Sequence, residues 1–115
     1  MPNTRLDDPV LIRFRNALST AYGGKLERVV LFGSRARGVA RPDSDYDIAV
    51  FIHGPDSFGD EAGRLAEIET DILFDTGVVI NALPFRAGAY LDRTGLMSEL
   101  RRDGVDLRPP RPPSI

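Results

Sequence analysis

Two aspartates stand two positions apart near the middle of the chain. Asp45 and Asp47 open an apolar run and follow a segment rich in glycine and arginine. Side chains two positions apart on a β-strand share a face, and neighbouring carboxylates repel each other. A divalent cation relieves that repulsion, and magnesium prefers such oxygen ligands together with phosphate oxygens. The pair is therefore a candidate metal site for phosphoryl transfer, where two-metal enzymes use this geometry.

A phosphate-binding turn is predicted upstream of the aspartates. Gly33 lets a ligand approach the backbone closely. Ser34 offers a hydroxyl and opens a short arginine-rich turn with free backbone N–H groups, an arrangement that suits phosphate. An isolated Asp-x-Asp pair is more often part of a turn or a solvated strand edge. Its place after Gly-Ser and arginines, between two apolar strands, favours the chemical interpretation here.

This stretch resembles a known family. Gly33-Ser34, ten intervening residues and Asp45-x-Asp47 before a strand form the signature of the polymerase-beta-like nucleotidyltransferases. The longer match, FGSRARG followed by SDYD, resembles the minimal nucleotidyltransferases of bacteria and archaea. The close match lies within residues 31–52, and the expected order of elements extends the resemblance over most of the chain.

The resemblance implies roles for the matching positions. The nucleotide-binding residues would be Gly33, Ser34, Arg35, Arg37, Asp45 and Asp47. Asp45 and Asp47 would also be catalytic and would ligate Mg²⁺, with ATP as the nucleotide donor. Arg35 and Arg37 would neutralise phosphate charge, although Arg35 could equally face solvent.

The third catalytic position departs from the resembled pattern. Family members usually carry a further carboxylate, which acts as base toward the acceptor hydroxyl, on the strand after the next helix. Asn81 falls nearest that place in this chain, and an asparagine cannot take up a proton but can orient a hydroxyl or a water. Asp71 and Asp75 are near in sequence, but their position at a helix end favours solvated charges.

The resemblance also implies a protein partner. Stand-alone members of the family typically act as antitoxins that pair with a helical HEPN-type ribonuclease toxin and can transfer AMP to one of its tyrosines. A chain of 115 residues has no room for a separate acceptor domain, so the acceptor is expected on a partner in a hetero- or homo-oligomer. Two alternatives stay open. One is a weak or inactive binding module that neutralises a partner by covering it, and the other is a small-molecule nucleotidyltransferase, which would need a further domain.

Periodic apolar segments predict the elements that position these residues. The predicted helices run from Asp7-Asp8-Pro9 to Tyr22 and over 60–74 and 87–102, the predicted strands are 26–32, 46–52 and 78–83, and residues 33–42 form a predicted loop. Strands interleaved with helices imply one sheet packed against helices. A loop of roughly a dozen residues between the first two strands fits an antiparallel pair. The fold class is therefore α/β (α+β) with a small mixed sheet, and the resemblance implies the polymerase-beta-like nucleotidyltransferase fold.

Helical spacing and side-chain type predict which residues are buried. The aromatic residues are expected in the core, including Phe58 and Phe74, and so are Leu73 and Leu91 on the apolar stripes of their helices. His53, the only histidine, is expected on the surface.

Composition narrows the class of protein. One domain is expected at 1–107, followed by a proline-rich, extended or disordered tail at 108–115. The chain has no cysteine, which excludes disulfides and thiolate metal sites. A net charge of −2 with weak arginine clusters gives no reason to expect direct nucleic-acid binding. No apolar run approaches the roughly 20 residues of a membrane span, and a cytoplasmic location is expected.

Overall fold

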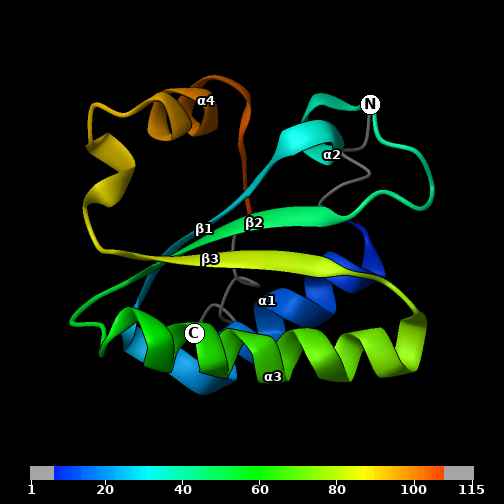
Figure 1. Cartoon of the computed structure of the whole chain (residues 1–115), viewed down its shortest axis with the longest axis horizontal. Helices are drawn as coiled ribbons and strands as arrows, with labels where there is room; N and C mark the ends of the chain where they lie inside the picture. The colour runs from blue at the N-terminus through cyan, green and yellow to red at the C-terminus, as the bar shows by residue number, and fades with distance from the viewer. Residues whose placement is uncertain (1–6, 108–115) are drawn as a thin grey trace, which may run out of the picture.

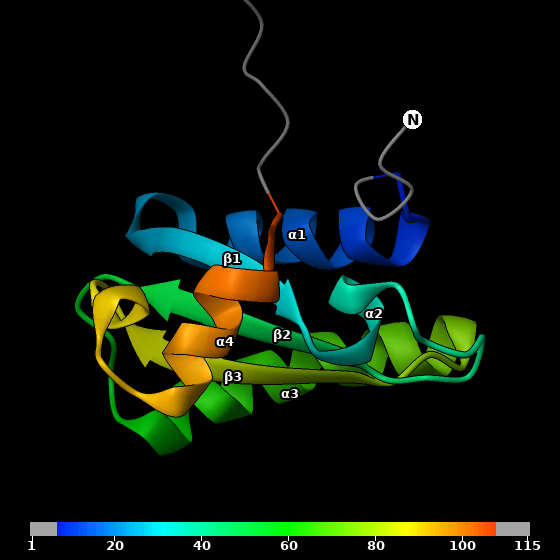
Figure 2. The same ribbon diagram turned by 90° about the horizontal axis from the view of Figure 1, so that it is seen from above.

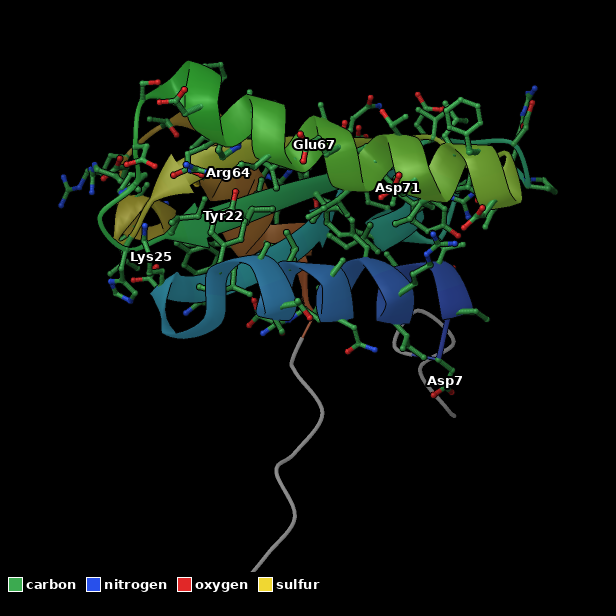
Figure 3. All side chains as sticks on the ribbon, turned by 90° about the horizontal axis from the view of Figure 1, so that it is seen from below. Asp7, Tyr22, Lys25, Arg64, Glu67 and Asp71 are labelled. Atoms are coloured by element: carbon green, nitrogen blue, oxygen red, sulfur yellow. The ribbon has the colours of Figure 1, made fainter. Side chains whose placement is uncertain are left out.

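Helices flank both faces of a central sheet in the computed structural model, which describes residues 7–107. α1 (Pro9–Tyr22) and α3 (Phe58–Thr76) lie side by side on one face (Figures 1 and 3). α2 (Gly33–Arg37) and α4 (Gly95–Asp103) lie on the other face (Figures 1 and 2). The predicted α/β fold, a small sheet packed against helices, is confirmed. The segment predicted as a tail, residues 108–115, lies outside the described residues.

The sheet has four strands in the order β3-β2-β1-β4. β1 (Leu26–Phe32) and β2 (Tyr46–Ile52) begin and end where the apolar runs predict. They pair antiparallel, whereas β3 (Ile80–Arg86) runs parallel to β2, so the predicted mixed sheet is confirmed. A short strand, β4 (Val105–Asp106), adds antiparallel to β1. Sequence patterns do not predict β4, because two residues carry no periodicity.

β3 is displaced toward the C-terminus relative to the predicted strand at 78–83 and continues through Pro84. A proline is tolerated in an edge strand when its missing N–H would face outward. Two residues earlier the N–H of Ala82 points to the outer edge, where the Glu69 carboxylate of α3 accepts it at 3.0 Å. N–H groups alternate sides along a strand, so Pro84 shares this outward orientation and breaks no bond to β2.

The helix predicted at 87–102 is divided in the structure. A 3₁₀ turn, η2 (Ala89–Leu91), precedes α4, which begins only at Gly95. Thr94 caps α4 with its side chain, which accepts a backbone N–H from the first turn at 3.1 Å. Gly95 is therefore the first residue of a new helix and not an interior position. Gly104 follows the last turn, as predicted.

The sheet buries side chains on both faces. Alternation along β2 sends Ile48 and Val50 toward α1 and α3, and Ala49 and Phe51 toward α4. Asp47 shares the second face because it lies two positions before Ala49. The site predicted from the sequence therefore opens on the side of the sheet that α2 and α4 cover only in part (Figure 2).

Four apolar side chains that the sequence places in the core are exposed. Phe58, Leu73, Phe74 and Leu91 are 69%, 44%, 84% and 74% exposed. α3 has 19 residues and spans roughly 28 Å, whereas the seven residues of β3 span roughly 23 Å. The ends of α3, which carry Phe58 and Phe74, therefore extend past the apolar surface of the sheet. Leu91 lies in η2 and not on the buried face of α4. His53 is exposed, as predicted.

Candidate active site

The turn from β1 into α2 brings the backbone against Asp47. Phe32 at the end of β1 pairs with Asp47 of β2, and the chain then turns at Gly33 with φ 75°. A Cβ atom at Gly33 would lie 2.5 Å from Asp47 Oδ2, so that carboxylate would have to move to admit a side chain. Glycine is thus favoured by its positive φ and again by the neighbouring carboxylate. The group that lies closest to the Gly33 backbone is therefore the Asp47 carboxylate, whereas the sequence predicts a ligand at this position.

The arginine-rich segment after this turn is a short helix and not the predicted loop. Ser34 lies half-buried in the first turn of α2, and Gly38 ends the helix in the left-handed conformation at φ 75°. The Ser34 carbonyl accepts the Val39 N–H at 3.1 Å. Ala36 is buried in the core on the α1–α3 side. Glycines on both sides and one buried alanine therefore fix a compact turn beside the carboxylates.

Three polar side chains converge where β2 and β3 begin. Asp47 and Asn81 are partners in the parallel register of the two strands. The Asn81 amide donates from Nδ2 to Asp45 Oδ2 at 3.1 Å and to Asp47 Oδ1 at 3.5 Å. Asp45 and Asn81 are exposed and Asp47 is half-buried. The spacing of the aspartates predicts their shared face, the resemblance predicts Asn81 nearby, and in the structure Asn81 lies on the same face as the two carboxylates.

Arg35 stabilises the loop that precedes Asp45. Its guanidinium donates to the Ser44 carbonyl from Nε and Nη2, at 2.9 and 2.7 Å, and to the Pro42 carbonyl from Nη2 at 3.1 Å. The same group lies 3.9 Å over the Tyr46 ring. A planar fork that bonds several carbonyls and stacks on a ring is a geometry that lysine cannot reproduce. Arg35 therefore positions the loop, a role that the sequence does not predict.

Arg37 has a different environment at the end of α2. It is exposed and forms a surface ion pair with Glu99 of α4, with 3.3 Å between Nη1 and Oε1. Exposed pairs of this kind contribute roughly 0–1 kcal/mol to stability. Arg37 is thus held only by a weak surface interaction. Phosphate binding by Arg35 and Arg37 stays a prediction.

Tyr46, between the two aspartates, ties the site strand to α1. Its hydroxyl donates to a carboxylate oxygen of Asp8, and the other Asp8 oxygen accepts the Val10 N–H at 2.9 Å to cap α1. Burial, with the hydrogen bond to Asp8, raises the pKa of Tyr46 to about 12. The hydroxyl therefore remains a proton donor at neutral pH. No sequence pattern predicts the contact between Tyr46 and Asp8, although a tyrosine at the central position of Asp-x-Asp must face the opposite side of the sheet.

The donor set fits magnesium. Asp45 and Asp47 offer convergent carboxylates, and Mg²⁺ is commonly held by one or two carboxylates plus phosphate oxygens and waters. Within residues 7–107, no group of three or more acidic, histidine or cysteine side chains could hold a metal. Asp71 is exposed on α3, and Asp75 forms an exposed ion pair with α1. Both therefore lie in the solvated surroundings that their helix-end position predicts.

A second acidic centre lies near the start of α3, at the end away from the site. Glu61 is only 1% exposed and accepts hydrogen bonds from the Tyr22 hydroxyl, the Arg64 guanidinium and the Asp56 N–H at 2.9, 2.9 and 2.8 Å. Figure 3 shows Tyr22 and Arg64 between α1 and α3. Burial pushes the pKa of Glu61 upward, but the hydrogen bonds from Asp56, Arg64 and Tyr22 outweigh burial and lower it. The same tyrosine has its pKa raised to about 12 by burial and by Glu61.

Comparison with known proteins agrees with this geometry. The model of the nucleotidyltransferase domain family matches residues 11–102. A relative from Methanocaldococcus jannaschii, named "Putative protein adenylyltransferase MJ0604", is 35% identical over 78 residues, which are 67% of this chain and 71% of the relative. Among the helices of the described residues, none has the length and apolar character of a membrane span.

Two solved structures share the fold. A crystal structure of a "putative nucleotidyltransferase" from Sulfolobus solfataricus has a TM-score of 0.62 and 21% identity, covering 88% of this chain and 77% of that one. A crystal structure of a toxin-antitoxin with AMP-PNP has a TM-score of 0.59 and 21% identity, covering 87% and 74%. At these identities the likeness is one of fold.

Proposed function

Because the chain belongs to the nucleotidyltransferase domain family, we propose that it transfers AMP from Mg-ATP to a hydroxyl group of a partner protein. The observation that carries this proposal is the convergence of Asp45 and Asp47 beside the Gly33-Ser34 turn. The relative named as an adenylyltransferase supports AMP as the transferred group.

Each residue of the site has its own expected role in the transfer reaction. Asp45 and Asp47 would hold Mg²⁺, which supplies charge neutralisation to the triphosphate when bound. The backbone at Gly33-Ser34 would lie against the phosphates, and Arg37 can swing from its surface ion pair toward them. The acceptor oxygen attacks the α-phosphorus, and the bond from that phosphorus to the bridging oxygen breaks. Pyrophosphate leaves with the electron pair, so positioning and charge stabilisation provide most of the catalysis.

Asn81 sets the expected speed of this reaction. Its amide can orient the acceptor hydroxyl or a water but cannot take up the proton, which passes to solvent. General-base help is typically worth about 10²–10⁴-fold. AMP transfer is therefore expected to be slow but measurable.

The acceptor is a protein of the HEPN ribonuclease type, toward which the chain acts as an antitoxin. The structural neighbour described as a toxin-antitoxin supports a protein partner. Exposed apolar side chains lie next to the site, since Leu73 and Val79 line one shallow hollow with Asn81, and Phe74 is 84% exposed beside them in the chain. A partner that packs on this apolar surface would have its hydroxyl within reach of Asn81.

Labelled ATP tests the reaction. The chain co-expressed with the product of its neighbouring gene, incubated with Mg²⁺ and α-labelled ATP, is expected to label the partner. Asp45→Asn and Asp47→Asn are expected to abolish labelling while the fold is retained, and exposed Asp71→Asn serves as the matched control. Labelling by Asp45→Asn at the parent rate would refute the assignment. Tight co-purification without label in the parent would support the binding-module alternative instead.

The two exposed phenylalanines of α3 test the partner surface. Phe58 is the first residue of α3, and Phe74 lies in its last turn, just before the chain enters β3 with Asn81. Figure 1 shows the two ends of α3 on opposite sides of the molecule. Phe74→Glu is expected to prevent co-purification by size exclusion, whereas Phe58→Glu leaves the complex intact. Equal behaviour of the two variants would remove this surface from the proposal.

A further inference from the structure

The amide of Asn81 bridges the two carboxylates of the site. We infer that the site binds a single divalent cation per nucleotide, and that the neutral side chain at position 81 prevents a second from binding. This inference rests on the proposed function. It departs from the two-metal arrangement that paired carboxylates often serve in phosphoryl transfer.

The charge of the site matches one cation. Asp45 and Asp47 together carry two negative charges, and within the described part of the chain no third acid joins them to make a metal cluster. One divalent ion balances the charge of these two side chains, and a second ion would have to rely on the triphosphate without a further acidic ligand from the protein. A second ion, at the roughly 3.5–4 Å spacing of two-metal sites, would face repulsion from the first that is four times that of unit charges.

The side chain of Asn81 gives a structural reason for this limit. Its Nδ2 donates to Asp45 at 3.1 Å and to Asp47 at 3.5 Å, and this orientation is the only one that gives each carboxylate a donor, since the amide oxygen would repel them. In solution without a cation, the amide thus offsets carboxylate repulsion. When turned about its last torsion angle, the amide offers one neutral oxygen to the cation that both aspartates hold. It brings no charge that would retain a second cation.

Counting bound ions tests the inference directly. Mn²⁺ binding is measured by electron paramagnetic resonance with the chain saturated by AMP-PNP, and ions are counted per bound nucleotide. The parent and Asn81→Ala are expected to bind one Mn²⁺ tightly. Asn81→Asp, which differs from the parent in one charge and not in shape, is expected to bind two, with the second ion held at least roughly tenfold more tightly than in the parent.

A matched charge control separates local from general effects. Asn16 is exposed on α1, on the opposite face of the sheet from the site, so Asn16→Asp adds the same charge elsewhere and is expected to leave the count at one. Thermal unfolding without cation gives a second readout. Asn81→Asp is expected to be less stable than the parent without Mn²⁺ and to gain more stability from it, because it gathers three carboxylates.

The outcomes distinguish this inference from the proposed function. Two tightly bound ions in the parent, or one ion in Asn81→Asp despite a native melting curve, would overturn the inference while leaving nucleotidyl transfer in place. If Asp45→Asn binds Mn²⁺ and AMP-PNP as the parent does, the proposed function itself fails. One ion in the parent and two in Asn81→Asp support both.

Discussion

Two acidic centres lie toward opposite ends of α3 and differ in how their carboxylates are satisfied. Glu61 is buried and accepts three hydrogen bonds, from Tyr22, Arg64 and the Asp56 N–H. At the other centre, the hydrogen bonds that reach the side chains of Asp45 and Asp47 from residues 7–107 come from the amide of Asn81. The first arrangement leaves no oxygen for a ligand, and the second leaves most of them open.

The difference separates structural from chemical use of the same functional group. A buried carboxylate costs stability unless donors surround it, so the donors of Glu61 join α1, α3 and the loop before α3. Adjacent carboxylates repel each other, and the amide of Asn81 offsets that repulsion only in part until a cation binds. The number of donors around an acid therefore indicates which of the two roles it has in this fold.

Removal of single charges should give opposite results at the two centres. Glu61→Ala leaves the Tyr22 hydroxyl without its acceptor and removes one of the two carboxylates that Arg64 contacts. We expect the free energy of unfolding to fall by about 3 kcal/mol. Asp45→Asn relieves repulsion, so stability should be unchanged or higher by no more than about 1 kcal/mol. Urea unfolding without divalent cations measures both, with exposed Asp60→Ala as control. If Asp45→Asn lowered the free energy of unfolding as much as Glu61→Ala does, the two acidic centres would not differ in the way proposed.

Two glycines with the same backbone conformation sharpen the comparison. Gly33 and Gly77 have φ of 75° and 74°, but only at Gly33 would a Cβ meet Asp47, whereas nothing lies within 4 Å at Gly77. Alanine at either position should cost about 1–2 kcal/mol of stability. Gly33→Ala should in addition displace the carboxylate and reduce AMP transfer about 100-fold. Transfer of labelled AMP is measured at a temperature below the melting temperatures of both variants. Equal transfer by the two variants would contradict the contact between position 33 and Asp47.

The predicted and unpredicted parts of the site differ in the range of the interactions that form them. Alternation along a strand is local, so the shared face of Asp45 and Asp47 follows from their spacing alone. The resemblance predicts Asn81 at the site, and the register of β2 with β3 pairs it with Asp47, while its catalytic role stays a prediction. The bonds of Arg35 depend on the conformation of the loop up to Ser44, which no sequence pattern encodes.

The sequence contains a signal for the buried position of Glu61 that the predicted elements do not use. Glu61 lies four and seven positions before Leu65 and Ile68, on the apolar stripe of α3, where an acid must be buried or paired. Its partner Tyr22 is 39 positions away, so the pairing could not be predicted. The overestimate of burial at Phe58 and Phe74 has a similar cause, because periodicity does not show where a helix extends past its sheet.

The two arginines of α2 test whether loop positioning or phosphate contact dominates near the carboxylates. Arg35→Lys retains the charge but loses the fork that bonds the loop carbonyls, so Mg-ATP binding should weaken roughly tenfold as Asp45 loosens. Arg37→Lys retains the charge of a surface pair and should change binding by less than about twofold. Calorimetric titration with Mg-AMP-PNP measures both. Reversed effects would favour phosphate neutralisation by Arg37 over positioning by Arg35.

Two glutamates on α3 should respond to pH with opposite signs. Hydrogen bonds lower the pKa of Glu61 despite its burial, whereas burial raises the pKa of Glu69, only partly offset by the hydrogen bond from the Ala82 N–H. The contribution of Glu61 is present above its unfolded pKa of about 4.3 and is lost as the pH falls through the folded value. The contribution of Glu69 is present below about pH 4.3 and is lost as the pH rises through its folded value.

Glutamine variants isolate these terms because they retain side-chain shape. At pH 7, Glu61→Gln should lower the free energy of unfolding by about 1–3 kcal/mol, and the deficit should shrink on acidification as the parent loses its ionised Glu61. Glu69→Gln can still accept the Ala82 N–H, so at pH 7 it should match the parent or exceed it by no more than about 0.5 kcal/mol. That advantage should vanish as the pH falls below about 4, where Glu69 becomes protonated in the unfolded state as well as in the folded state. Urea unfolding between about pH 3 and pH 7 includes the range below the unfolded pKa in which the Glu61 contribution is lost, and it measures both series. Slopes of the same sign would show that burial, and not the count of donors, governs both acids.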